Sequence, residues 1–264
     1  MSIYTDNLAE FVKILQIYQL ISPENKLPSL KLKKHIRDSG NVFEFDITNN
    51  SSGSFKIFEA IKSIMNLLRE GKYECTLASA GNHAAAVCAV IQSMKDLSDD
   101  DKKTLHEIIG GNFDLNKLQD FVVYPYVPEN TPKTKLDRIK AAGFEPIIAG
   151  ANIGEAREAI RLNPEHNKLS FLSAYLGENV LIGNMAAGKI LADNILENQH
   201  LFQKSAGSAI TKINIWVSVG GGGLSSGTIE ALEDLQRNNK DSLDFHYHFH
   251  HDILILHKYH LEYL

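Results

Sequence analysis

The chain has 264 residues, of which 44% are apolar and 22% charged, and its net charge is −5. These values are typical of a globular protein large enough for one large or two small domains, and the net charge gives no reason to expect a nucleic acid or an anionic membrane as partner. Neither a membrane-spanning run nor a signal-peptide pattern is recognisable, and with only Cys75 and Cys88 present we expect a reducing cytoplasm.

The first predicted element is a helix that begins after Asp6 or Asn7. Its apolar residues recur at helical spacing and are expected to face the core: Leu8, Phe11, Val12, Leu15 and Tyr18.

A first strand-to-helix junction follows. Residues 42–47 alternate apolar with acidic side chains, as a half-exposed strand does, and residues 49–54 form a turn. A helix is expected to begin near Phe55 or Lys56. The positive end of that helix disfavours the charged form of the Lys56 amine, so Lys56 is a candidate nucleophile; a solvated surface lysine is the simpler alternative.

A second junction lies at residues 74–94. A short strand at 74–78 leads through a polar turn at 79–83 into an alanine-rich helix. Asn82 has both a donor and an acceptor, which suits it to hold an oxygen of a bound ring or carboxylate. His83 has two interpretations, a packed histidine with a satisfied partner or a catalytic one. The charged residues 95–117 after this helix are expected to form a solvated helical hairpin.

The third junction contains four consecutive glycines, residues 220–223. An apolar strand precedes them, and Ser225 and Ser226 can cap the helix that follows. Exposed N–H groups at the positive end of a helix favour an anion, and this pattern predicts a phosphate site. Known nucleotide motifs fit poorly, because no lysine precedes Thr228 and the third glycine of a dinucleotide fingerprint is absent. A flexible turn without a ligand is the alternative.

Taken together, these junctions carry a resemblance. The segments SGSFK (52–56), ASAGNHA (78–84) and GGGGL (220–224) resemble, in this order, those of pyridoxal-phosphate enzymes of the tryptophan-synthase-β fold type, most closely threonine or serine dehydratases. Residues 127–135 and 140–146 resemble two further segments of that family. The resemblance implies an α/β protein with two parallel-sheet, helix-flanked domains and a cofactor cleft between them. The larger domain would comprise residues 1–59 and 153–264, and the smaller one residues 60–152 with the charged insertion near 95–117.

The same resemblance implies an active site. Lys56 would form a Schiff base with pyridoxal 5'-phosphate and act as base on the substrate α-proton, while Ser54 would help to protonate the leaving group. Asn82 would hydrogen-bond the phenolate oxygen of the cofactor. The phosphate would be held by Gly220, Gly221, Gly222, Gly223 and Leu224. The substrate carboxylate would be held by Ser79, Ala80, Gly81 and His83.

The implied activity is dehydration and deamination of a β-hydroxy amino acid, threonine or serine, to a 2-oxo acid and ammonia. The partners would be this small substrate and, as in many relatives, further copies of the chain. The alternative is a catalytically inactive, truncated relative that at most binds cofactor or a partner protein.

Some segments depart from the family pattern. Phe58 and Glu59 stand where an Arg-Gly pair is usual, which places bulk and an acid near Lys56. Residues 183–188 replace a Gly-Gln-Gly-Thr-like turn. The chain ends at Leu264, before the segment that would supply a partner for the cofactor's ring nitrogen, so the larger domain is expected to be incomplete.

The C-terminal residues 246–260 are rich in histidine instead. As a strand they would place His246, His248 and His250 on one face, but without accompanying acidic or cysteine ligands we expect no metal site.

Overall fold

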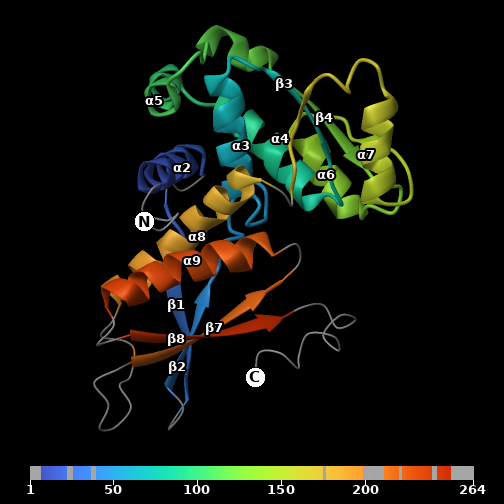
Figure 1. Cartoon of the computed structure of the whole chain (residues 1–264). Helices are drawn as coiled ribbons and strands as arrows, with labels where there is room; N and C mark the ends of the chain where they lie inside the picture. Colours follow the sequence, from blue (N-terminus) through green and yellow to red (C-terminus); the bar gives the residue numbers. More distant parts are fainter. Residues whose placement is uncertain are drawn as a thin grey trace.

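In the computed structural model, the described residues are 7–22, 26–36, 40–174, 177–198, 202, 211–219, 222–239 and 243–250; over these ranges the chain forms three β-sheets and the helices around them (Figure 1). Helices α8 (Glu178–Glu197) and α9 (Gly223–Asn238) cross the middle of the molecule. The largest sheet lies on one side of them, and the two smaller sheets lie on the other.

The largest sheet has four parallel strands in the order β5-β4-β3-β6. Its strands are β3 (Glu74–Ala78), β4 (Val122–Val127), β5 (Ile147–Ile148) and β6 (Ser170–Phe171). All residues of β3 after Glu74 are buried, as expected for a parallel strand with both faces covered. The helices around this sheet are α4 (Asn82–Lys95), α6 (Lys133–Ala141) and α7 (Ile153–Leu162).

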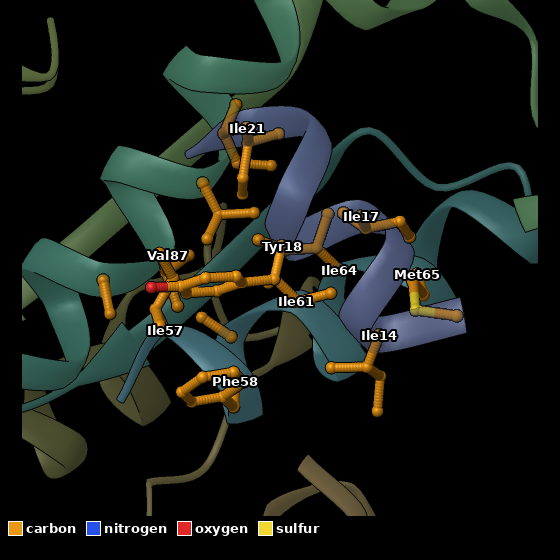
Figure 2. Packing of buried hydrophobic residues seen from close by; sticks show 14 of the residues in the cluster. Ile14, Ile17, Tyr18, Ile21, Ile57, Phe58, Ile61, Ile64, Met65 and Val87 are labelled. Atoms are coloured by element: carbon orange, nitrogen blue, oxygen red, sulfur yellow. The ribbon is translucent and has the colours of Figure 1, made fainter. Parts of the chain in front are cut away.

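The main core lies where α2 (Leu8–Ile21), α3 (Ile57–Arg69) and α4 meet. Tyr18 of α2 stacks on Phe58 of α3 with ring centroids 4.8 Å apart, and Figure 2 shows both rings among the isoleucines of α2 and α3. The predicted inward face of α2 is partly wrong, because Leu8 and Val12 are exposed. This helix has more apolar residues than one face can hold, and its partners select which of them are buried.

Glycines allow α8 to approach two other helices closely. A Cβ at Gly188 would lie 2.7 Å from the carbonyl oxygen of Gly227 in α9, and a Cβ at Gly183 would lie 2.5 Å from the Cα of Glu59 in α3. Without side chains at these positions, α3, α8 and α9 pack nearly backbone to backbone. Their N-terminal halves are thereby brought together.

The two smaller sheets have two strands each in the part of the chain that is described. β7 (Thr211–Ser218) pairs in parallel with β8 (Leu243–His250), whereas β1 (Leu30–Ile36) pairs antiparallel with β2 (Gly40–Phe45). The prediction of an α/β protein with helix-flanked parallel sheets is therefore confirmed. The antiparallel β1–β2 pair was not predicted.

The charged residues near 95–117 form helix α5 (Asp99–Ile109) and a 3₁₀ turn, η1 (Leu115–Asp120). Three aspartates in the first turn of α5 match the positive helix end, and Ser98 caps it by accepting from the N–H of Asp101. Leu105 and Ile109 are buried, so the insertion is anchored to the core as well as solvated. The division into two domains at residue 152 stays a prediction. Helix α7 and strand β6 follow that residue, and β6 pairs with β3, a strand that the prediction assigns to the smaller domain.

Candidate active site

Lys56 lies at the N-terminal end of α3, at the junction predicted from the sequence. Its backbone N–H donates to the Oγ of Ser54 (3.3 Å), and Ser54 is itself buried. The Lys56 amine donates to Oε2 of Glu59 (3.0 Å) and to the carbonyl oxygen of Ala174 (3.1 Å), and lies 5.0 Å from the ring centroid of Phe55. Its side chain is 14% exposed. The helix end alone would disfavour the ammonium, but the Glu59 carboxylate stabilises it.

Glu59 is the centre of the site. Its side chain is completely buried in the first turn of α3, and besides Lys56 it contacts two polar side chains from other helices. Nδ1 of His83 in α4 lies 2.8 Å from Oε1, and Nδ2 of Asn184 in α8 donates to Oε2 at 3.2 Å. A carboxylate only accepts hydrogen bonds, so Nδ1 of His83 carries the proton. Three donors, one of which is the Lys56 ammonium, thus compensate a charge that would be costly to bury alone.

The second predicted junction connects β3 to α4. The buried Oγ of Ser79 accepts from the N–H groups of Gly81 (3.1 Å) and Ala84 (3.4 Å), which fixes the turn before the helix. Gly81 has φ +108°, a conformation that favours glycine. Asn82, the first residue of α4, is exposed, whereas His83 points inward to Glu59.

Lys135 of α6 lies over this turn. Its amine donates to the carbonyl oxygen of Ala80 at 3.1 Å, and its side chain fills the space where a Cβ at Gly81 would be. The turn predicted to receive a carboxylate therefore has a lysine beside it.

At the third junction, α9 begins at Gly223 after Gly222, which has φ +82° and is left-handed. Apart from the neighbours of Gly222 in the chain, no atom of the described residues lies within 4 Å of the place where a Cβ at Gly222 would be. Ser225 and Ser226 were predicted to cap this helix, which is wrong: both lie inside its first turn, and the Ser225 hydroxyl donates to the carbonyl oxygen of Gly222. Two residues of the predicted phosphate loop, Gly220 and Gly221, lie outside the described residues.

Asn184 connects the third junction to the other two. A Cβ at Gly223 would lie 3.0 Å from Nδ2 of Asn184, the atom that donates to Glu59. The start of α9, the Lys56 amine and His83 therefore lie around one buried carboxylate. The sequence had placed Asn184 in a turn, but it lies inside α8. Glu59 and Asn184 were not predicted as site residues, although both stand at departures from the family pattern.

Other candidate groups lie elsewhere. Residues 7–22, 26–36, 40–174, 177–198, 202, 211–219, 222–239 and 243–250 contain no group of three or more histidine, cysteine, aspartate or glutamate side chains that could hold a metal ion. His246 contacts Asp244, and His248 contacts Asn214 and stacks on Trp216; the His250 side chain lies outside the described part of the chain.

Burial raises the pKa of the Cys75 thiol to about 12 and also raises the pKa of the Cys88 thiol, so neither is a reactive thiolate. None of the helices in the described ranges is both long and apolar enough to cross a bilayer.

Comparison with curated proteins finds relatives of one kind. The chain is 30% identical over 186 residues to the biosynthetic L-threonine dehydratase IlvA of Corynebacterium glutamicum, a match that covers 69% of this chain and 35% of that protein. It is 27% identical over 215 residues to the enzyme of the same name from Haemophilus influenzae, covering 81% of this chain and 33% of that protein. The chain thus spans about a third of the length of these relatives. No protein-family model matches the sequence.

Solved structures with the same fold include the diaminopropionate ammonia lyase of Escherichia coli, with a TM-score of 0.64, 14% identity and coverage of 91% of this chain and 59% of that one. The threonine deaminase isoform 2 of Solanum lycopersicum gives a TM-score of 0.57 at 21% identity, covering 92% and 60%. The chain belongs to the tryptophan-synthase-β fold type.

Proposed function

We propose that the chain binds pyridoxal 5'-phosphate through Lys56 and the start of α9, and that it belongs to a protein that converts threonine or serine to a 2-oxo acid and ammonia. The observation that carries this proposal is the meeting of three helix N-termini around Lys56 and the buried Glu59. The similarity to L-threonine dehydratases supports the choice of substrate class.

The geometry fits both ends of this cofactor. At α9, the first N–H groups of the helix lack intrahelical partners, and Gly222 leaves open space beside them, which suits a phosphate. At α3, an amine that is 14% exposed can reach an aldehyde. Asn184 lies between the two ends, and its buried Oδ1 has no hydrogen-bond partner among the described residues.

In this proposal each residue has a physical task. Once bound, the cofactor supplies an electron sink for the pair left by the substrate α-proton. The Lys56 amine holds the cofactor and, when released, takes that proton. The N–H groups of Gly222, Gly223 and Leu224 hold the phosphate. At the β3–α4 turn, Ser79, Ala80 and Gly81 lie beside Lys135, where a substrate carboxylate would be attracted, and Asn82 would bind a cofactor oxygen.

The first test is borohydride trapping. Wild-type protein incubated with pyridoxal phosphate and reduced should carry the cofactor covalently at Lys56, as mapped by mass spectrometry. Lys56→Ala should carry none there, while the control Lys103→Ala, which changes an exposed lysine of α5, should be labelled like the wild type. A folded protein that is not labelled at Lys56 would disprove the proposal.

The second test concerns the phosphate. Gly222→Asp and Gly222→Asn add side chains of nearly equal shape to the same open space, so both carry the same backbone strain. The aspartate should weaken binding of pyridoxal phosphate about tenfold or more relative to the asparagine, because two like charges meet. Equal affinities would place the phosphate elsewhere.

One observation favours the alternative, a relative that binds cofactor without turnover: the Lys56 amine already has a carboxylate partner. If protein that can be labelled at Lys56 also releases a 2-oxo acid from threonine or serine, the result would support an enzyme. Covalent labelling without product would support the binding role.

A further inference from the structure

His83 and Lys56 share the same counter-ion. Each lies within hydrogen-bonding distance of a different oxygen of Glu59, at 2.8 Å and 3.0 Å. Glu59 is completely buried and His83 is 2% exposed, so water cannot compensate the charge of the carboxylate. The groups facing Glu59 are Lys56 from its own helix, His83 from α4 and the neutral Asn184 from α8. Lys62, the next lysine along the chain, forms an ion pair with Glu10 of α2 instead, with 2.6 Å between Nζ and Oε2.

We propose that His83 is the reserve counter-ion of Glu59. When the Lys56 ammonium loses a proton and becomes an amine, His83 binds a proton at Nε2 and becomes an imidazolium, so the number of protons held by the cluster is unchanged. The inference rests on the proposed function in one respect, since binding the cofactor's aldehyde is the event that would remove Lys56 from the ion pair. The coupling itself belongs to the protein alone.

Nε2 is the atom that can accept this proton. Nδ1 already carries a proton and donates it to Glu59, whereas Nε2 is buried and has no hydrogen-bond partner among the described residues. Its lone pair is therefore available. Asn184 cannot take this role, because an amide stays neutral.

The magnitudes favour proton uptake by His83. A buried carboxylate without a counter-ion costs several kcal/mol. An imidazolium keeps Glu59 paired with a cation and leaves one N–H, at Nε2, without a hydrogen-bond partner. Because Nδ1 of His83 lies 2.8 Å from Oε1 of Glu59, we expect the attraction between the imidazolium and the carboxylate to outweigh the unsatisfied N–H. Glu59 would then keep a cationic partner whether or not Lys56 is charged. Glu59 is thus a positioning residue that lets the lysine change its charge.

The test follows the imidazole resonance of His83 by NMR as a function of pH, in the full chain without cofactor. His83→Gln identifies the resonance by its loss. In Lys56→Met, which keeps the aliphatic stem and removes the amine, the titration midpoint of His83 should lie about one pH unit or more above that of the wild type. In Lys56→Arg, which keeps a cation, it should stay near the wild-type value.

The same comparison in a Glu59→Gln background tests whether the carboxylate carries the coupling. There, Lys56→Met should shift the midpoint of His83 by less than half as much. If Lys56→Met does not fold, as judged by circular dichroism, Lys56→Gln replaces it as the neutral variant.

Two results would overturn the inference: an unchanged His83 midpoint in the folded neutral variant, or a shift of equal size without the Glu59 carboxylate. Because no cofactor is present, these results are independent of borohydride trapping at Lys56. Failure of the proposed function and failure of this coupling are therefore measured separately.

Discussion

Gly183 of α8 packs against the backbone of Glu59 in α3. A Cβ at Gly183 would lie 2.5 Å from Cα and 2.7 Å from N of Glu59, and 2.7 Å from the carbonyl oxygen of Phe58. All three atoms are backbone, so no side-chain rotation can make room. This contact holds the next residue of α8, Asn184, within reach of the Glu59 carboxylate.

Gly183→Ala is therefore expected to lower the free energy of unfolding by about 2 kcal/mol, because overpacking outweighs the gain of about 1 kcal/mol in helix propensity. Urea unfolding measures the change. Gly154→Ala is the matched control on α7, where the new Cβ would meet only Oδ1 of Asn152 at 3.1 Å. Similar effects of the two substitutions would contradict the close packing of α3 and α8.

Alanine substitutions at Gly81 and Gly222 compare backbone strain combined with steric overlap against backbone strain alone. Both have positive φ, +108° and +82°, but a Cβ at Gly81 would lie 2.6 Å from Cδ and 2.7 Å from Cβ of Lys135, whereas the space beside Gly222 is open. Gly222→Ala should cost about 1–2 kcal/mol of stability from strain alone. Gly81→Ala should cost at least about 1 kcal/mol more.

Thermal unfolding of the two variants provides the comparison. Adding Lys135→Ala to Gly81→Ala should recover only part of the difference, because the Cβ of residue 135 and the strained φ both remain. Full recovery would show that the distal atoms of Lys135 account for the whole difference between the two glycine variants.

The sequence predicted the three strand-to-helix junctions because their signals are local. Serine, asparagine and glycine form the turns, and apolar periodicity defines the helices on either side. Lys56 accordingly lies at the start of α3, as expected, whereas His83, predicted as the last residue of the turn, is the second residue of α4. Their proposed chemical roles stay predictions.

What the sequence did not reveal depends on long-range packing. Glu59 contacts His83 and Asn184 across 24 and 125 residues of chain, and no local pattern encodes that meeting. The buried face of α2 was misassigned at Leu8 and Val12 for the same reason, since its partners α3, α5 and α8 decide which apolar stripe is covered. The caps of α9 were misassigned because Gly222 takes the capping position one turn earlier.

Phe58 joins the core to the site, since it stacks on Tyr18 and precedes Glu59. Its side chain is completely buried, so Phe58→Ala should destabilise the protein by about 3–5 kcal/mol. Phe58→Leu keeps most of the volume and should cost less than about 1.5 kcal/mol. Leu162→Ala, at a leucine that is 65% exposed, should change stability by less than about 0.5 kcal/mol in the same urea titration. A small effect of Phe58→Ala would contradict the packing seen in Figure 2.

Glu10 predicts a pH dependence of stability. Partial burial of its carboxyl raises the pKa, but hydrogen bonds and charges of Arg69 and Lys62 outweigh this effect and lower the pKa from 4.5 to about 2. A carboxyl whose pKa is lower in the folded state stabilises that state above its unfolded pKa. This contribution is lost as the pH falls from 4.5 to about 2, where the carboxyl becomes protonated in both states.

Glu10→Gln should therefore lower the free energy of unfolding at pH 7 by about 2 kcal/mol, a value reduced for screening because the side chain is partly exposed. The difference from wild type should shrink below pH 4.5 and continue to fall toward pH 2. Urea titrations between neutral and acidic pH measure it. Glu70→Gln removes the partner of Lys72 in an ion pair whose side chains are both more than half exposed, and should have little effect at any pH. If the effect of Glu10→Gln were the same at neutral and acidic pH, its cause would be lost packing, and the ion pairs to Arg69 and Lys62 would contribute little to stability.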